Sequence, residues 1–247
     1  PVRMLRAVRL AAKLDLIIAP NAEAPILELG ELLNEVPAAR LYDELIKLFH
    51  AGHATRSFDL LIRYNLFQYL LPAVNKCNQE DRSREAFKFI REGLQNTDDR
   101  VCSDRPVTPA FLFAVFLWYP VLDLAGKLVR EGRSEAQAML DASSLIIREQ
   151  QNQASLPRRF WSPIKDIYLM QRRFMNRRGI RSARLLYHRR FRAGYDFLLL
   201  RSKHGEVDRE IADWWTDVQQ LEPEAQKKAF FVKGRHRKRG YRSGGDE

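Results

Sequence analysis

Apolar residues recur at intervals of three and four along nearly the whole 247-residue chain, and this spacing limits the possible folds more than any other feature. It places apolar side chains on one face of an α-helix, whereas a half-buried strand needs strict alternation. Val2, Leu5, Val8 and Ala12 are the first example. Alternating segments are scarce, and the one short candidate, residues 66–71, lies between helical patterns. The sequence therefore predicts an all-α, multi-helical fold without an internal repeat.

Turn signals, mostly Pro and Gly, divide this pattern into separate helices. The segment 96–106 is interpreted as a polar loop in which Asp98 and Asp99 are solvated. A Trp pair, Trp214 and Trp215, is expected to be a packing anchor near the end of a helix. After a first helix that starts near Pro1, we predict helices at residues 24–34, 38–51, 54–64, 81–95, 108–117, 120–130, 134–151, 162–177, 180–187, 189–202 and 205–221.

The formal net charge of +11 is distributed unevenly along the chain. Residues 1–156 carry a net charge of −1, residues 157–203 carry +12, residues 204–226 carry −6 and residues 227–247 carry +6. A concentrated cationic segment indicates a polyanionic partner, either nucleic acid or an anionic membrane surface. Residues 227–247 are basic, contain Gly and have few aliphatic side chains, so we expect a disordered cationic tail.

The segment 157–203 is the strongest functional signal. Only Asp166 and Asp196 oppose its fourteen Lys and Arg residues, whereas a merely solvated helix face would mix both signs. Arg side chains bind phosphates in bidentate fashion and stack on bases. The interleaved aromatic residues share a helical face with apolar ones, so we assign them to the core. The predicted RNA-binding residues are Arg158, Arg159, Arg172, Arg173, Arg177, Arg178, Arg181, Arg184, Arg189, Arg190 and Arg192.

Several catalytic and binding motifs are absent from the sequence. It has no phosphate-binding G-x-x-x-x-G-K-[ST] loop, no G-x-G-x-x-G and no G-x-S-x-G. Gly52 separates His50 from His53, so we predict no metal site there.

Two cysteines, Cys77 and Cys102, form no disulfide framework and favour a reducing, cytoplasmic compartment; whether they pair stays open. The longest apolar stretch, Ala110–Tyr119, is too short to span a bilayer, so no transmembrane segment is expected.

The opening segment PVRMLRAVRLAAKL, residues 1–14, resembles the neck-helix motif of the class II nucleotidyltransferase superfamily, which holds bacterial poly(A) polymerases and CCA-adding enzymes. In that family an acidic pair precedes the motif, and Phe is usual where Leu10 stands. Later segments are similar to bacterial poly(A) polymerases in particular. These segments are residues 37–44, 64–72, 109–120 and 191–201, the Asp-Trp-Trp of residues 213–215, and the basic tail.

The resemblance implies an all-α neck, body and leg that follow a catalytic head absent from this sequence. We therefore expect the sequence to be part of a longer chain. In the family the head binds Mg²⁺ and ATP and transfers AMP to RNA 3′ ends. The resemblance further implies that Arg3 reads the edge of the incoming base with support from Arg6, that this sequence alone is inactive, and that it holds no catalytic residue, metal or cofactor itself.

On this basis we expect neck helices at residues 1–60, a helical body at 61–151, a basic RNA-binding leg at 152–226 and a disordered tail at 227–247. The expected function is RNA binding within a polyadenylating enzyme that acts in RNA decay and processing. Single-stranded RNA 3′ ends are the expected partner, and the tail is expected to recruit RNA-decay or RNA-chaperone proteins.

Two alternatives remain open at this stage. The chain could be the equivalent part of a tRNA CCA-adding enzyme, which shares the neck motif. It could also be a basic helical scaffold that binds an anionic membrane or an acidic partner, because net charge alone does not distinguish RNA from other polyanions.

Overall fold

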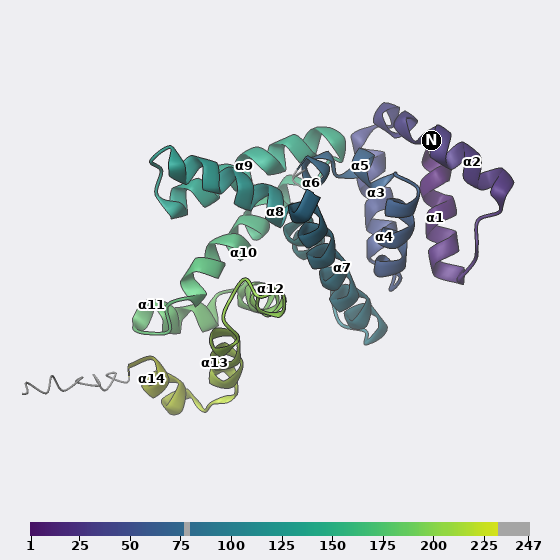
Figure 1. The fold of residues 1–247 in the computed structure, drawn as a ribbon. Helices are drawn as coiled ribbons and strands as arrows, with labels where there is room; N and C mark the ends of the chain where they lie inside the picture. The colour runs from purple at the N-terminus through teal and green to yellow at the C-terminus, as the bar shows by residue number, and fades with distance from the viewer. Residues whose placement is uncertain (77–79, 232–247) are drawn as a thin grey trace, which may run out of the picture.

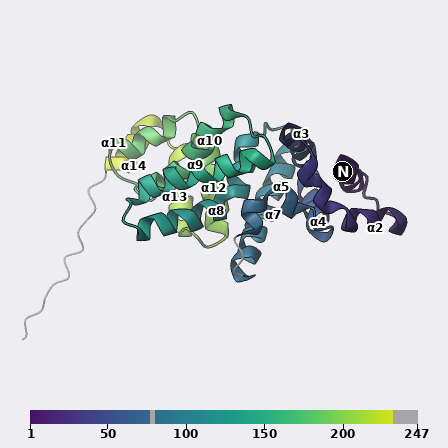
Figure 2. The same cartoon turned by 90° about the horizontal axis from the view of Figure 1, so that it is seen from above.

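The computed structural model of the chain describes residues 1–76 and 80–231. These residues form helices joined by short connections and contain no strand, which confirms the all-α prediction. The helices build an elongated, bent body in which α1 and α14 lie at opposite ends (Figures 1 and 2).

The N-terminal end is built around α1 (Val2–Leu14), which packs against α3 (Ala38–Phe49) and α4 (Ala54–Arg63). The connection from α1 to α3 contains α2 (Pro20–Glu28) and the 3₁₀ helix η1 (Gly30–Glu35), where a single helix over 24–34 was predicted. The one-turn helix α5 (Phe67–Leu70) occupies the segment that had offered the strand candidate, and a second one-turn helix, α6 (Pro72–Asn75), follows it.

The centre of the molecule consists of α7 (Glu80–Cys102), α8 (Pro109–Arg130) and α9 (Glu135–Gln153). The helix α8 packs on α7, α9 and α10, and it is buried on nearly all sides from Ala110 to Val121. It continues through Pro120, although the sequence had suggested two shorter helices. By length and composition alone α8 could therefore span a membrane, but 67% of its apolar window is buried inside the protein, as in a core helix.

The helix α7 extends to Cys102 and so includes most of the predicted 96–106 loop. Asp98 is buried in it, and its carboxylate accepts hydrogen bonds from the backbone N–H groups of Ala54 (2.7 Å) and Thr55 (2.9 Å). These groups open α4, whose first N–H groups have no partner within the helix. The interpretation of Asp98 as solvated was therefore wrong, because it caps a neighbouring helix. Asp99 is exposed, as predicted.

The C-terminal part contains seven short elements. They are η2 (Arg158–Phe160), α10 (Trp161–Phe174), α11 (Ile180–Ala183), η3 (Arg184–Tyr187), α12 (Phe191–Lys203), α13 (Arg209–Gln220) and α14 (Pro223–Phe231). The start of α13 is set by Asp208, whose carboxylate accepts a hydrogen bond from the N–H of Glu210 at 3.0 Å. Its predicted start at residue 205 was therefore too early.

Two hydrophobic cores organise the chain, and α10 and α12 connect them. The large core extends from Met4 to Leu200, and α10 contributes Ile167 and Tyr168 to it. The small core lies among the C-terminal elements, where α10 contributes Met170 and Phe174. Because α10 and α12 have residues in both cores, the packing fixes the position of the basic segment against α7 and α8.

The small core confirms the predicted packing role of the Trp pair. Trp215 is fully buried and donates a hydrogen bond from Nε1 to the carbonyl of Phe174 at 2.8 Å, while both Trp rings contact Phe230. Phe230 lies on α14, so residues 227–231, expected to belong to a disordered tail, are helical. Residues 232–247, the rest of that tail, and Cys77 lie outside the described residues.

Candidate nucleic-acid interface

The predicted RNA-binding arginines lie on η2, the end of α10, the α11–η3 segment and the start of α12, and in the two connections that join α10 to α11 and η3 to α12. Three of them form ion pairs: Arg172 with Glu135 at 3.3 Å, Arg177 with Glu210 at 2.8 Å, and Arg192 with Asp196 at 3.0 Å. Among the described residues the others have no carboxylate partner within 4.0 Å, and all but the half-buried Arg190 are exposed. These unpaired arginines are Arg158, Arg159, Arg173, Arg178, Arg181, Arg184, Arg189 and Arg190.

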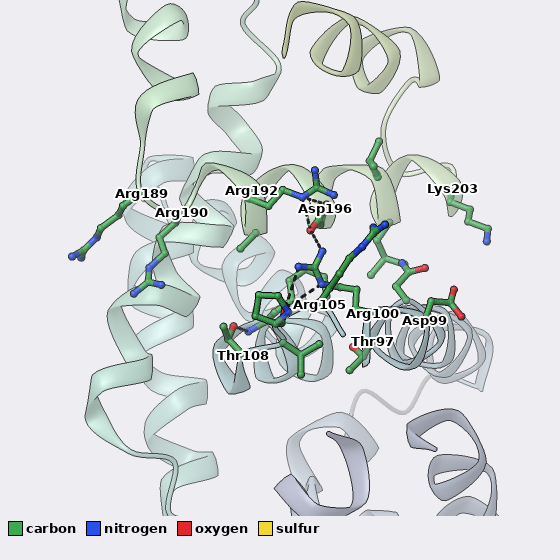
Figure 3. A pocket seen from close by; sticks show the side chains of 17 residues that line it. Thr97, Asp99, Arg100, Arg105, Thr108, Arg189, Arg190, Arg192, Asp196 and Lys203 are labelled. Carbon is green, nitrogen blue, oxygen red and sulfur yellow. Dashed lines mark hydrogen bonds and ion pairs between the residues drawn. The ribbon is translucent and has the colours of Figure 1, made fainter. Parts of the chain in front are cut away.

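Some of these arginines line a cavity. It has a volume of about 500 Å³ and lies between the end of α7, the loop that leads to α8, and α12 (Figure 3). Six cationic side chains and two acidic ones, Asp99 and Asp196, line it. The cationic residues are Arg100, Arg105, Arg189, Arg190, Arg192 and Lys203; we call them the cationic rim.

Arg100 holds the loop side of the cavity in place. Its Nε and Nη2 atoms donate hydrogen bonds to the carbonyl oxygen of Pro106 at 3.2 and 3.0 Å. The backbone N–H of Arg105 in turn donates to the carbonyl of Arg100 at 2.8 Å. Thr108 then begins α8, its hydroxyl oxygen accepting from the N–H of Phe111. These contacts give the loop a fixed conformation beside α12.

Asp196 binds two arginines of the cationic rim. Its carboxylate lies 3.0 Å from Nε of Arg192 and 3.4 Å from Nη1 of Arg100 (Figure 3). Burial raises the pKa of Asp196 above its usual value, although the charges of Arg192 and Arg100 act in the opposite direction. The cavity therefore contains a carboxylate that is costly to keep ionised and that neutralises part of the rim.

Arg189 and Arg190 lie at one side of the cavity and Lys203 at the other (Figure 3). Lys203 pairs with Glu92, whereas the two arginines have no acidic partner among the described residues. The Nε of Arg190 is buried and has no hydrogen-bond acceptor there. A buried donor without an acceptor is costly, and an acceptor that reached this atom would remove that cost.

The wall of the cavity is mainly apolar. Phe111 from the first turn of α8 is half-buried, and its ring centroid lies 6.2 Å from that of Phe197. Leu199 is 37% exposed although it is aliphatic. The other apolar lining residues are Pro106, Val107, Ala193 and Leu200.

The structure brings only three of the predicted RNA-binding residues, Arg189, Arg190 and Arg192, to this cavity. Arg3 and Arg6 are exposed on α1, which lies toward the opposite end of the molecule from α11–α14 (Figure 1). Sequence reasoning missed Arg100 and Arg105, because segment charge counts placed them in a near-neutral region. Arg105 directly precedes Pro106, and this turn signal close to Arg100 was available in the sequence.

An all-helical fold with clustered arginines and an arginine-lined cavity is typical of the class of proteins that bind polyanions. Comparisons with known proteins narrow this class. Residues 131–244 match the family model described as the arginine-rich C-terminus of polymerase A. Residues 15–77 match the one described as its probable RNA- and SrmB-binding site.

The relatives agree with both matches. The chain is 40% identical over 231 residues to poly(A) polymerase I of Escherichia coli O6:H1, covering 92% of this chain and 50% of that protein. It is 38% identical over 223 residues to the enzyme of the same name from Haemophilus influenzae, covering 89% and 49%. A CCA-adding enzyme of Leuconostoc citreum is 31% identical over 75 residues, covering 30% and 19%.

The chain belongs to the family of bacterial poly(A) polymerases, which are nucleotidyltransferases. It spans about half the length of the curated relatives it matches. The family implies use of ATP and a metal ion. Among the side chains that the structure describes, no group of three from His, Cys, Asp or Glu is placed to hold a metal.

Proposed function

We propose that this chain grips single-stranded RNA for a poly(A) polymerase that adds AMP from ATP to RNA 3′ ends. The observation that carries the proposal is the group of eight arginines that have no carboxylate partner among the described residues, two of which line the cavity. Such side chains are available for phosphates, whereas an ion-paired arginine must first leave its carboxylate.

The chemistry of untemplated polyadenylation favours this type of surface. The terminal sequence of the RNA changes as the tail grows, so the protein has to hold the strand independently of its sequence. Contacts to phosphates position a strand without reading it. Arginines spread over several helices supply such contacts, and the binding they provide weakens steeply as salt is added.

The same proposal includes the roles of the separate parts of the chain, the nucleotide contacts, the compartment and the protein partners. Residues 1–60, 61–151 and 152–226 would serve as neck, body and RNA-binding leg, and Arg3 with Arg6 would contact the incoming nucleotide. This chain by itself would bind RNA but transfer no AMP, since Mg²⁺ and ATP would be held mainly by other residues of the enzyme. We place the protein in the cytoplasm, with RNA-decay or RNA-chaperone proteins as partners of residues 227–247.

The test is fluorescence anisotropy with a labelled single-stranded oligo(A) at several salt concentrations. In a first variant Arg173, Arg178, Arg189 and Arg190 are all changed to Gln. The expected result is weaker binding and a shallower dependence of log K on log[salt], by about 0.7 for each phosphate that the variant no longer neutralises.

A matched variant controls for net charge. It changes four exposed cations outside the proposed leg, Lys88, Lys127, Arg130 and Arg148, to Gln. We expect it to keep the affinity and salt dependence of the parent chain. If the two variants bind oligo(A) equally well, the basic segment 157–203 is not the RNA-binding surface. AMP transfer by the chain alone, measured with ATP and Mg²⁺, would contradict the proposed division of labour.

A further inference from the structure

The cavity beside Arg100 combines two surfaces that a purely electrostatic grip does not need. Its cationic rim is suited to phosphate, and its apolar wall of Pro106, Val107 and Phe111 is suited to a flat, weakly polar group. A volume of about 500 Å³ falls within the range of pockets that bind small ligands. The ligand indicated by both surfaces has an aromatic ring joined to an anion.

We propose that the cavity takes one nucleotide unit of the bound RNA strand, with its base against Phe111 and its phosphate between Arg189, Arg190 and Arg192. The inference rests on the proposed RNA binding and adds a defined site to it. The cavity lies partly at residues 96–108, outside both family-model matches, which end at residue 77 and resume at residue 131.

The rim geometry supports the phosphate position. The Nε of Arg190 is buried without an acceptor among the described residues, and Arg189 beside it has no carboxylate partner there. Arg192 already holds an anionic group, because it lies 3.0 Å from the carboxylate of Asp196. A phosphate at this place would replace the carboxylate of Asp196 as the anionic partner of Arg192. It would also give Arg190 an anionic partner, which it lacks among the described residues.

The wall geometry supports the base position. Phe111 lies in the first turn of α8 and packs on Phe197, so its ring is held rather than free to rotate away. The loop that supplies Pro106 and Val107 to the same wall is fixed by the hydrogen bonds from Arg100 to Pro106. A preformed pocket costs little ordering energy on binding. Stacking of a base on an aromatic side chain is worth about 1–3 kcal/mol and tolerates any base.

The experiment compares two labelled strands of equal length, oligo(A) and a fully abasic strand that keeps the phosphates. Both should bind the full chain, because the arginines contact phosphates. Oligo(A) should bind about 5- to 150-fold more tightly, which is the fold-change that one stacked base supplies. In Phe111→Leu, which keeps apolar packing against Phe197 but removes the aromatic plane, this preference should shrink while abasic binding stays unchanged.

Two further variants make the result independent of folding defects. Val107→Ser changes the wall from the loop, outside the hydrophobic cores, and should also reduce the preference for oligo(A). Tyr187→Ala removes an aromatic ring that is 78% exposed on the basic segment but does not line the cavity, and should leave the preference intact.

The outcomes separate the two proposals. Equal binding of both strands by the parent chain overturns the nucleotide pocket and leaves the RNA grip standing. Loss of the preference in Tyr187→Ala, with retention in Phe111→Leu and Val107→Ser, places base stacking elsewhere and also overturns it. If neither strand binds, the proposed function fails as well.

Discussion

The guanidinium of Arg100, near the end of α7, lies 3.4 Å from the carboxylate of Asp196 on α12. Both side chains are mostly shielded from solvent, with 28% and 21% of their surface exposed. The same carboxylate also binds Arg192, one turn earlier on α12. Asp196 thus connects two segments that are far apart in sequence, and it neutralises charge at the place where we propose that a phosphate binds.

Replacing Asp196 with Asn should therefore strengthen RNA binding. The substitution releases Arg100 and Arg192 from an anionic competitor and adds one unit of positive charge at the rim. We expect oligo(A) to bind several-fold more tightly at moderate salt, as measured by anisotropy. Asp166→Asn makes the same change in net charge on α10, away from the cavity, and should have a smaller effect. Equal effects of both variants would show that only net charge matters.

The raised pKa of Asp196 gives this prediction a pH dependence. Burial favours the protonated form, while Arg192 on the same helix and Arg100 on α7 favour the ionised one. The other rim cations, Arg105, Arg189, Arg190 and Lys203, line the same cavity. As pH falls through the raised pKa, Asp196 becomes neutral, so the parent chain should approach the affinity of Asp196→Asn. If the ratio of the oligo(A) affinities of Asp196→Asn and the parent chain stays constant between pH 7.5 and pH 4, this prediction is wrong.

Helix periodicity predicted the fold class and most helices, because each long helix buries one face in a core. Periodicity failed where contacts with other helices determine whether a residue is buried or a helix continues. Asp98 looks like a loop residue in sequence, yet it is buried because the N-terminus of α4 needs its carboxylate. Likewise Pro120 does not interrupt α8, which its neighbours support on nearly all sides.

The site was predictable only in part, for a related reason. Charge counting found Arg189, Arg190 and Arg192, since they belong to one dense segment. It could not find Arg100, whose contribution depends on α7 ending beside α12. It also could not tell that Arg201, in the same basic segment, pairs with Glu206 at 2.9 Å and lies over the ring of Trp118.

Gly93 marks a close approach of α7 to α8 and should not tolerate Ala. A Cβ atom there would lie 2.6 Å from Cγ1 of Val115, a stiff β-branched side chain in the core. Overpacking costs about 1–3 kcal/mol and exceeds the gain in helix propensity of up to about 1 kcal/mol. We expect Gly93→Ala to lower the free energy of unfolding in a urea titration.

Gly126, inside α8, provides the matched control. A Cβ atom there meets only the end of the Arg130 side chain, at 3.7 Å. Gly126→Ala should therefore raise the free energy of unfolding by up to about 1 kcal/mol. If the two substitutions have effects of the same sign, the close approach at Gly93 does not determine the packing of α7 on α8.

His50 should make the protein less stable in mild acid. Burial lowers its pKa below the usual 6.5, and its Nε2 is buried without a partner among the described residues. Its folded pKa is depressed, so below pH 6.5 the unfolded chain binds more protons, and stability falls as pH decreases through the folded pKa. Each unit of pKa difference corresponds to about 1.4 kcal/mol.

Chemical denaturation between pH 7.5 and pH 5 measures this contribution. In His50→Gln the loss of unfolding free energy over that range should be smaller than in the parent chain. His53→Gln, three residues further on, leaves His50 and its surroundings in place and should retain the parent's dependence. An unchanged pH profile in His50→Gln would mean that other groups cause the acid sensitivity.

Phe230 should be essential for the small core although it lies near the end of the described chain. It is 2% exposed, its ring contacts Trp214 and Trp215, and its carbonyl accepts a hydrogen bond from the N–H of Gly179 at 2.9 Å. Truncating a buried Phe to Ala costs about 3–5 kcal/mol. We expect Phe230→Ala to shift tryptophan fluorescence and to lower the melting temperature of the C-terminal elements.

Phe231→Ala, at a side chain that is 58% exposed, should change stability by no more than about 0.5 kcal/mol. Equal stability of the two variants would show that α14 does not complete this core.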